Sequence, residues 1–288
     1  AFEAAGIPNA AVTYDRTSSN QRAVATGGAE APYLINLLRI TPDQRPLFVA
    51  AVGEGFLAGH HNIGLWYWES DVVAPQQREA FGLVDEIWVA TQYLTRAFDG
   101  HGLPVTVVPS PLVFEAPDPA PGDRQRLGLD DRFTFLFSFD YLSVAERKNP
   151  LGLAEAYRKA FPDPDGGTAL ILKSINGEIF AEEMAGLVHG VSGRPDIIVR
   201  DELLPAEARL ALVAAADCYV SLHRPEGLGL TTAEAMAVGT PGIATAYSGN
   251  LDFMPEGSAL LVPAAEVEVG PGHYYPAEGH WADPDIDA

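Results

Sequence analysis

Short apolar runs alternate with longer amphipathic stretches along the whole chain. This alternation is typical of repeated βα units, in which the strands form a parallel sheet and the helices cover it. In the first half of the chain the pattern predicts strands at residues 9–15, 32–38, 62–68, 86–91 and 105–110, and a helix at 92–98 that Thr91 caps. We therefore expect a Rossmann-like domain in this half.

A stretch rich in Pro, Gly and Asp, residues 113–132, interrupts the pattern and lacks apolar periodicity. Such a composition marks a linker, so we predict two domains, residues 1–115 and 116–288. In the second domain the pattern predicts strands at 133–140, 168–175, 196–201, 218–222, 241–245 and 259–263, and helices at 149–161, 205–216 and 231–239. The acidic tail, residues 281–288, is expected to fray. Two α/β domains in tandem would leave a cleft at the carboxyl ends of their strands, where ligands of such folds bind.

Composition narrows the class of protein. Of the 288 residues, 47% are hydrophobic and 20% are charged, and no apolar run reaches the length of a membrane span, about 18 residues. The lone Cys218 excludes an intrachain disulfide, and the seven histidines show no metal-binding spacing, which favours a cytoplasmic protein without a metal cofactor. The net charge of -21 repels nucleic acid and acidic membranes, so an anionic ligand would need a local binding device.

One candidate device is the stretch EGLGLTTAEAMAVGTP, which begins at Glu226. Gly227 and Gly229 permit a tight turn and a close approach to a ligand, and the helix expected from Thr231 would present N–H groups and a positive dipole end. Glu226 before the turn and Glu234 inside the helix would flank a bound diphosphate and accept hydrogen bonds from sugar hydroxyls, as a nucleotide sugar requires. A capped helix with a solvated Glu226 and a dipole-stabilised Glu234 is an equally open interpretation.

A second candidate device is the stretch ERKNP. Asn149 suits the N-cap of a helix, and Pro150 suits its first position. Arg147 and Lys148 would then lie beside a second helix N-terminus, directly after the strand at 133–140. Lys and Arg are the residues that neutralise phosphate charge in a transition state. A solvated basic pair at a helix start is the open alternative.

Further basic residues lie near the ends of predicted strands. Lys173 falls near the end of the strand in LILKSING, and His223 and Arg224 follow the strand before Glu226. Each could reach the same cleft. For Lys173 an ion pair is favoured over a ligand contact, whereas the position of Arg224 beside Glu226 favours a ligand contact.

Aromatic residues mark the first domain. Trp66, Trp68 and Glu69 end a strand that is expected to face the cleft. Two aromatic rings and a carboxylate could stack on a sugar acceptor and accept its hydrogen bonds, so Trp68 and Glu69 are candidates for the acceptor side. In the alternative, the aromatic rings pack into the core and only Glu69 is exposed.

Taken together, these residues resemble family 4 of the glycosyltransferases, retaining enzymes of the GT-B fold, and within it a mannosyltransferase-like bacterial group. The resemblance rests on NIGLWYWESD, DEIWVAT, FSFDYLSVAERKNP, LILKSING and HRPEGLGLTTAEAMAVGTPGIATAYSGNLDF, within residues 33–254. The last block is the most specific. The resemblance implies an α/β protein with two Rossmann-like domains that face a central cleft: an acceptor-side domain over residues 1–115 and a donor-binding domain over residues 116–288.

The resemblance also implies roles for the candidate residues. Glu226 would contact the donor sugar and Glu234 the nucleotide ribose, while Lys148 with Arg147 would neutralise the leaving phosphate. Backbone amides facing the sugar and the diphosphate would come from Gly227, Leu228, Gly229, Leu230 and Thr231, with Lys173 and Arg224 as further donor contacts. The implied reaction moves a hexose from a nucleotide-diphosphate sugar, GDP-mannose or a UDP-sugar, to a saccharide or lipid-linked acceptor in polysaccharide biosynthesis. It needs no metal, and the departing phosphate helps to deprotonate the acceptor on the face from which it leaves.

The sequence departs from the family pattern at three places. Ser143 stands where the common arrangement has an arginine, so Arg147 would take over its role. Trp68 and Glu69 stand where many members have a histidine. The chain begins with AFEAAGIP, which resembles the end of a helix, and stops at WADPDIDA, so both ends look trimmed and the leading strand of the first domain is missing.

Two other classes of protein fit parts of the sequence. A nicotinamide-dependent oxidoreductase also places glycines after a strand, but Thr232 stands at the third glycine position and the strand at 241–245 ends without the acidic residue that would hold a ribose. A catalytically inactive glycosyltransferase-like fragment or partner subunit is favoured by the trimmed ends. The presence of Glu226, Glu234 and Lys148 argues against it.

Overall fold

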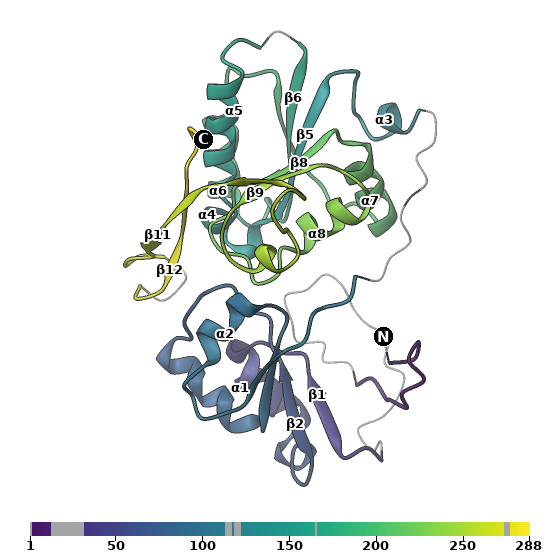
Figure 1. Cartoon of the computed structure of the whole chain (residues 1–288), viewed down its shortest axis with the longest axis vertical. Coiled ribbons are helices and arrows are strands. Elements are labelled where there is room, and N and C mark those ends of the chain that lie inside the picture. The colour runs from purple at the N-terminus through teal and green to yellow at the C-terminus, as the bar shows by residue number, and fades with distance from the viewer. Residues whose placement is uncertain (1, 13–31, 113–116, 118–121, 165, 274–276) are drawn as a thin grey trace. The chain divides into compact units, whose positions relative to one another are not determined.

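The computed structural model describes residues 2–12, 32–112, 117, 122–164, 166–273 and 277–288. Contacts within the chain divide it into two compact units, Ala1–Pro111 and Leu112–Ala288 (Figure 1). The predicted domain boundary, between residues 115 and 116, lies outside the described residues. Each unit has a parallel sheet of its own.

In the part of unit 1 that the structure describes, four parallel strands form a sheet in the order β1-β2-β3-β4. These are β1 (Ile35–Leu38), β2 (His61–Leu65), β3 (Glu86–Val89) and β4 (Val105–Val107). The helices are α1 (Arg45–Val52) and α2 (Gln92–Phe98), with 3-10 helices η1 (Pro42–Gln44), η2 (Glu54–Phe56) and η3 (Pro75–Leu83). The helix predicted at 92–98 is confirmed, and Thr91 occupies its N-cap position.

The first predicted strand of unit 1 is wrong over the part that the structure describes. Residues 9–12 belong to no strand, and residues 13–15 lie outside the described residues. An apolar run becomes a strand only where another strand completes its hydrogen bonds, and in the described sheet of unit 1 β1 pairs with β2. The pattern alone carries no information about such a partner.

Unit 2 is built on six parallel strands in the order β10-β9-β8-β5-β6-β7. The strands are β5 (Phe133–Asp140), β6 (Thr168–Ile175), β7 (Ile197–Asp201), β8 (Cys218–Ser221), β9 (Gly242–Thr245) and β10 (Leu260–Val262). The predicted strands at 133–140 and 168–175 are confirmed residue for residue. The strand order reverses between β5 and β8, and ligands of such sheets bind outside the carboxyl ends of the strands at this reversal.

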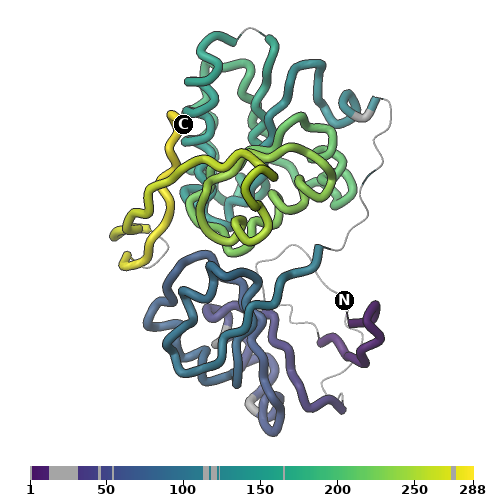
Figure 2. The backbone as a smooth tube through the Cα atoms, in the orientation of Figure 1, coloured from purple at the N-terminus to yellow at the C-terminus, as the bar shows by residue number. Residues whose placement is uncertain are grey.

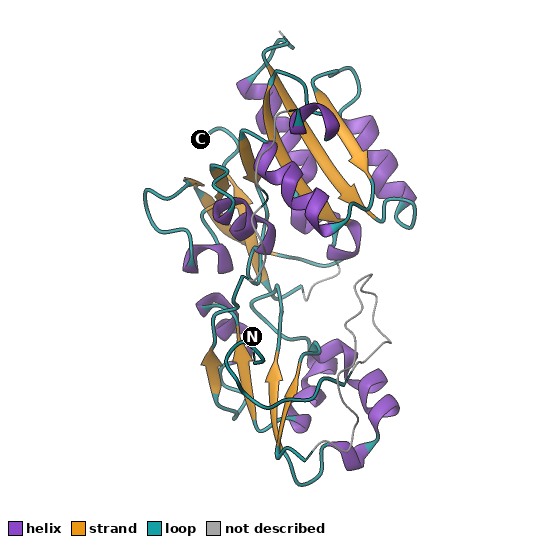
Figure 3. Cartoon of the chain, turned by 90° about the vertical axis from the view of Figure 1, so that its right-hand side faces the viewer, coloured by secondary structure: helices purple, strands orange, loops and turns teal. Residues whose placement is uncertain are grey.

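Helices cover both faces of the sheet of unit 2 (Figure 3). They are α3 (Asp123–Arg126), α4 (Ala145–Lys148), α5 (Pro150–Ala160), α6 (Ala181–Gly190), α7 (Ala206–Ala215) and α8 (Leu230–Ala237), with 3-10 helices η4 (Tyr141–Ser143) and η5 (Gly249–Asp252). Helix α5 packs against α6, and α7 packs against α3 and α8. Because both faces are covered, the central strands are apolar on both sides, and Leu136, Leu170 and Leu172 are fully buried.

Unit 2 ends in a hairpin that the sequence pattern did not predict, β11 (Ala264–Glu268) with β12 (His280–Pro284). The expectation that residues 281–288 fray is wrong for the first four of them, which form most of β12. Trp281 is buried, and this burial together with the ladder to β11 outweighs the acidic composition of the tail. After β12 the end of the chain lies beside α5, where Lys159 Nζ donates to Asp287 at 2.7 Å (Figure 2).

Candidate functional site

The turn after β5 carries Arg147 and Lys148. Both belong to the short helix α4, and the left-handed Asn149 (φ 56°) ends it and starts α5. The Asn149 side chain accepts a hydrogen bond from Gly152 N at 3.2 Å and donates one to Leu222 O at 2.9 Å. The predicted N-cap at Asn149 is thus confirmed, and the same side chain ties the turn to the end of β8.

The loop after β8 carries Glu226 and the glycine turn. Gly229 adopts a left-handed conformation (φ 79°) at the N-cap of α8, where a Cβ would lie 3.4 Å from Asn250 Cβ. Helix α8 begins at Leu230, one residue before the predicted start. Gly229 has no side chain that could cap the first N–H groups of α8, so these groups and the positive end of the helix dipole suit an anion.

Glu226 contacts both cations of the turn after β5. Lys148 Nζ donates to Glu226 Oε1, and Arg147 Nη1 lies 3.2 Å from Glu226 Oε2. Arg147 is 1% exposed and also donates to Ser143 O at 3.0 Å and to Pro225 O at 2.8 Å. The structure therefore brings together three residues that the sequence analysis drew from two separate motifs. They lie after β5 and β8, where the strand order reverses.

The charge state of Glu226 follows from these contacts. Burial would raise the pKa of its carboxyl group, but the charges of Lys148 and Arg147 outweigh burial and hold the pKa well below its ordinary value of 4.5. Glu226 is therefore a carboxylate at physiological pH, and a carboxylate only accepts hydrogen bonds. It is suited to hold hydroxyl groups and not to donate a proton.

His223 belongs to the support of the loop, because it is fully buried. Its Nε2 lies 3.1 Å from Asn250 Oδ1 and 3.3 Å from Tyr247 O, and its Nδ1 lies 3.1 Å from Ser221 Oγ. Both partners of Nε2 are acceptors, so Nε2 carries the proton and Nδ1 accepts from Ser221. Burial lowers the pKa of His223 and keeps the ring neutral. Its role in the structure is to fix the segment that precedes and forms η5.

That segment in turn holds the backbone of Glu226. Ser248 Oγ accepts from Glu226 N at 2.8 Å, and Gly249 N donates to Glu226 O at 2.9 Å. A Cβ on Gly249 would lie 2.2 Å from Gly227 O and 2.9 Å from Glu226 O, closer than side-chain carbons approach backbone. A side chain at position 249 would therefore displace the loop that contains Glu226 and Gly227, so this position requires glycine.

We expect the Gly249→Ala variant to lose at least tenfold in affinity for a nucleoside diphosphate, because the added methyl group displaces the backbone of Gly227 and with it the glycine turn that would approach the diphosphate. Isothermal titration of the wild type and the variant measures the loss. Gly186→Ala is the matched control: Gly186 lies in α6, nothing lies within 4 Å of its Cβ position, and alanine favours a helix. Equal affinity in the Gly249→Ala variant and the wild type would contradict the expectation.

Glu234 lies on the buried side of α8 and pairs with a residue that the sequence analysis did not select. Arg209 of α7 donates through Nη2 to Glu234 Oε1 at 2.8 Å and through Nη1 to Glu234 Oε2, a bidentate ion pair. The side chain of Glu234 is 7% exposed and that of Arg209 is 26% exposed. In the sequence, Arg209 is distinguished only as the charged residue that begins the otherwise apolar stretch RLALVAAA.

The side chain of Lys173 is buried in β6, and that of Arg224 contacts the hairpin of β11 and β12. Lys173 is 3% exposed. Burial lowers its pKa, the negative charge of Glu202 raises it, and the positive charge of Arg209 lowers it further. The guanidinium of Arg224 lies 4.9 Å from the centre of the Trp281 ring and donates to Ala282 O at 3.0 Å. The Arg224 side chain is thus held by the hairpin, while its backbone N donates to Arg147 O at 2.8 Å.

In unit 1, the aromatic residues of NIGLWYWESD are placed as in the core-packing alternative. Trp66 is 2% exposed and packs against Phe81 and Phe98, at centroid distances of 5.6 and 5.5 Å. Trp68 is 6% exposed and donates through Nε1 to Val72 O at 2.9 Å. Glu69, which follows, is partly exposed. The rings therefore stabilise unit 1, and the carboxylate is the accessible member of the group.

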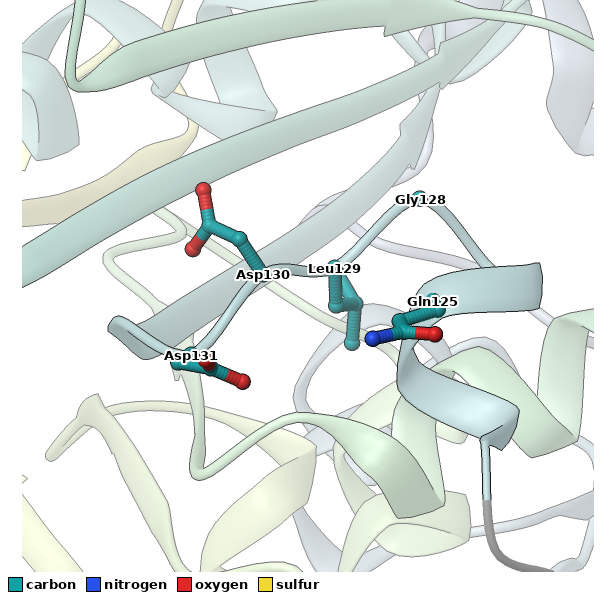
Figure 4. Close-up of a pocket in the computed structure, with 5 residues that line it drawn as sticks. All are labelled: Gln125, Gly128, Leu129, Asp130 and Asp131. Atoms are coloured by element: carbon teal, nitrogen blue, oxygen red, sulfur yellow. The ribbon is translucent and has the colours of Figure 1, made fainter.

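Three further observations bear on the chemistry. The described residues contain no group of three or more His, Cys, Asp and Glu side chains arranged to hold a metal ion. In the same part of the chain no helix combines the length and the apolar character that crossing a membrane demands. A surface pocket lies at the amino end of β5, at the opposite end of that strand from Arg147, and its two aspartates disfavour an anion (Figure 4). It is lined by Gln125, Gly128, Leu129, Asp130 and Asp131.

Comparisons with known proteins found one matching family model and solved structures of similar fold. Residues 166–269 match the family model of the Glycosyl transferases group 1. HepE of Anabaena, solved in complex with UDP and glucose, is similar with a TM-score of 0.61 and 17% identity over 80% of this chain and 64% of HepE. Sucrose-phosphate synthase from Thermosynechococcus elongatus has a TM-score of 0.61 and 20% identity over 82% of this chain and 62% of its own. No curated protein matches the chain.

The two parallel α/β units and the similarity to these structures define the GT-B fold. Within this fold, residues 166–269 of unit 2 carry the match to the Glycosyl transferases group 1. The chain spans slightly less than two thirds of the length of the structures named above.

Proposed function

We propose that this protein is a retaining glycosyltransferase that moves a hexose from a nucleotide-diphosphate sugar to a saccharide or lipid-linked acceptor. The observation that carries the proposal is the contact of Glu226 with Lys148 and Arg147 at the reversal between β5 and β8. The cluster combines two cations for a phosphate with one carboxylate for a sugar. The match of residues 166–269 to the Glycosyl transferases group 1 supports the same function.

In the proposed reaction, the bond between the anomeric carbon and the diphosphate oxygen breaks. The acceptor oxygen bonds to that carbon on the same face, and the acceptor proton passes to the departing phosphate. Lys148 and Arg147 stabilise the negative charge that develops on this phosphate, together with the N-terminus of α8. No metal ion takes part, so we expect turnover to be unchanged in the presence of EDTA.

The carboxylates select the donor in this proposal. Glu226 accepts hydrogen bonds from hydroxyls of the transferred sugar, and Glu234 accepts them from the nucleotide ribose. The glycine turn, Gly227 to Thr231, lets backbone N–H groups approach the diphosphate. The side chain of Lys173 is buried in β6, and the guanidinium of Arg224 is already held by the hairpin, so neither is proposed as a direct ligand.

The proposed donor is GDP-mannose or a UDP-sugar. The resemblance of the glutamate motif favours GDP-mannose, whereas HepE, which shares the fold, was solved with UDP-glucose. On the acceptor side we propose Glu69, because the ring of Trp68 packs inside unit 1. The acceptor is a saccharide or a lipid-linked saccharide, whose hydroxyl groups a carboxylate recognises.

A thermal-shift screen tests the proposed function. We expect one of UDP, GDP and ADP, and its sugar conjugate, to raise the melting temperature of the protein; a ligand at 100 times its Kd stabilises the native state by about 2.7 kcal/mol. The parent nucleosides, which lack the diphosphate, serve as controls and are expected to have no effect. The donor selected in this way is then incubated with the protein, and release of the nucleoside diphosphate is measured.

The outcomes separate the candidate functions. Binding followed by release supports the enzyme. Binding without release, with water and with a panel of saccharides as acceptors, would favour the inactive partner subunit. No shift with any nucleotide sugar would overturn the donor site itself.

A further inference from the structure

Arg209 and Glu234 form a bidentate ion pair. Arg209 lies in the first turn of α7 and Glu234 in the second turn of α8, so the pair joins two neighbouring helices of unit 2. Both oxygens of the Glu234 carboxylate are engaged by the two terminal nitrogens of the one guanidinium. The plane of the carboxylate is therefore fixed by the plane of the guanidinium.

The pair leaves Glu234 able to bind a ligand. Each carboxylate oxygen has two acceptor positions, and Arg209 uses one on each oxygen. The remaining positions lie on the outer sides of the carboxylate. These two positions point to opposite sides of the carboxylate, so each can accept a hydrogen bond from one hydroxyl group, such as one of a ribose, in a direction that the pair keeps fixed.

Burial makes the pair necessary. The side chain of Glu234 is 7% exposed, and a buried carboxylate without a counter-charge is costly. A free glutamate side chain also has three torsions, each of which would have to be ordered when a ligand binds. Because Arg209 supplies the charge and the fixed plane in the protein alone, these costs fall on folding and not on ligand binding.

From this geometry we infer that Arg209 is a positioning residue that holds Glu234 in the orientation that recognises a hydroxyl group of a ribose. The inference rests on the proposed function, which assigns Glu234 to the ribose. It adds that the preference for a ribonucleotide over its deoxy counterpart depends on Arg209, although Arg209 acts through Glu234 and does not touch the ligand.

A comparison of paired nucleotides tests the inference. The Kd values of UDP, 2′-deoxy-UDP, GDP and 2′-deoxy-GDP are measured by titration calorimetry for the wild type, Arg209→Met, Glu234→Gln and the double variant. We expect the wild type to prefer the ribonucleotide, and Arg209→Met to reduce this preference about tenfold, roughly the worth of one hydrogen bond to a charged group. In the Glu234→Gln background, Arg209→Met should have no further effect on the preference.

Arg194 provides the control, because it also makes a bidentate pair with a buried carboxylate, that of Asp196 at the amino end of β7. Arg194 Nε lies 2.8 Å from Asp196 Oδ1, and Nη2 lies 2.6 Å from Asp196 Oδ2. Arg194→Met should lower the melting temperature as Arg209→Met does, yet leave the ribose preference unchanged. Arg209→Lys, which keeps the charge but loses the planar fork, should reduce the preference and serves if Arg209→Met does not fold.

The results separate the inference from the proposed function. If the wild type binds no nucleoside diphosphate, the proposed function fails and the inference with it. If the wild type binds one but does not distinguish ribose from deoxyribose, or if the Arg209 variants keep the full preference, only the inference is overturned.

Discussion

Replacing Lys148 with methionine is expected to lower the turnover of the protein about 10²- to 10³-fold, the usual cost of removing one group that stabilises developing charge. Lys148 Nζ is bonded to Glu226 in the structure and lies in the turn after β5. In the proposed reaction its charge offsets the charge that appears on the departing phosphate, and methionine keeps the length of the side chain but not the charge. The measurement is the rate of nucleoside diphosphate release at saturating donor.

The control for Lys148 is a lysine in the same unit with no proposed role. Lys159 lies at the end of α5, pairs with Asp287 and Glu155 and is 42% exposed, so Lys159→Met should keep the wild-type rate. Circular dichroism and the melting temperature establish that both variants are folded. A folded Lys148→Met protein with at least a third of the wild-type rate would remove Lys148 from the catalytic machinery.

The fold of unit 2 was largely predictable because its strands are buried on both faces. The segments FTFLFSFD and TALILKSI are long apolar runs with clear ends, and each became a strand over the predicted residues. In unit 1 the predicted strand at 62–68 ends three residues earlier, at Leu65, since Trp66 and Trp68 contribute to the core from beyond the strand. Apolar residues that leave a sheet and still pack into the core have the same sequence pattern as residues of a strand.

The hairpin at the end of unit 2 was not predictable in the same way. Strand β11 is mostly exposed, so it lacks an apolar pattern, and its partner β12 lies in an acidic segment. What orders β12 is Trp281, which packs under Arg224 and beside Val144. These contacts join positions far apart in the sequence, and neither segment indicates the other.

The candidate site was predictable in its residue types but not in its pairings. Helix caps and glycine turns are local signals, and they placed Asn149 and Gly229 correctly. The pairing of Glu234 with Arg209 depends on how α7 packs against α8, which local signals do not encode. The support of Glu226 by Ser248 likewise depends on β9 lying beside β8.

Replacing Glu226 with glutamine is expected to change binding and turnover in opposite directions. Turnover should fall about 10²- to 10³-fold, because the carboxylate that holds the sugar hydroxyls is lost. Affinity for the free nucleoside diphosphate should rise, because Lys148 and Arg147 are no longer neutralised by Glu226 and their charge becomes available to the phosphate. Lys148→Met should instead weaken this affinity. Calorimetry with the nucleoside diphosphate therefore distinguishes the role of the Glu226 carboxylate from that of the two cations, Lys148 and Arg147.

The stability of the Glu226→Gln variant provides an independent measure of the same cluster. Arg147 is 1% exposed, so removing its counter-charge should lower the free energy of unfolding by about 3 kcal/mol at pH 7. The pKa of Glu226 in the folded state is below its ordinary value of 4.5, so its contribution is complete above that pH and declines as the pH falls towards the lowered pKa. The difference between wild type and variant, measured by urea unfolding, should therefore shrink between pH 5 and about pH 3. Glu155→Gln, at an exposed position of α5, should show no such change.

A Glu226→Gln protein with wild-type turnover, or with weaker nucleoside diphosphate binding, would contradict the proposed roles within the cluster, in which the carboxylate of Glu226 binds the sugar and the cations Lys148 and Arg147 bind the phosphate.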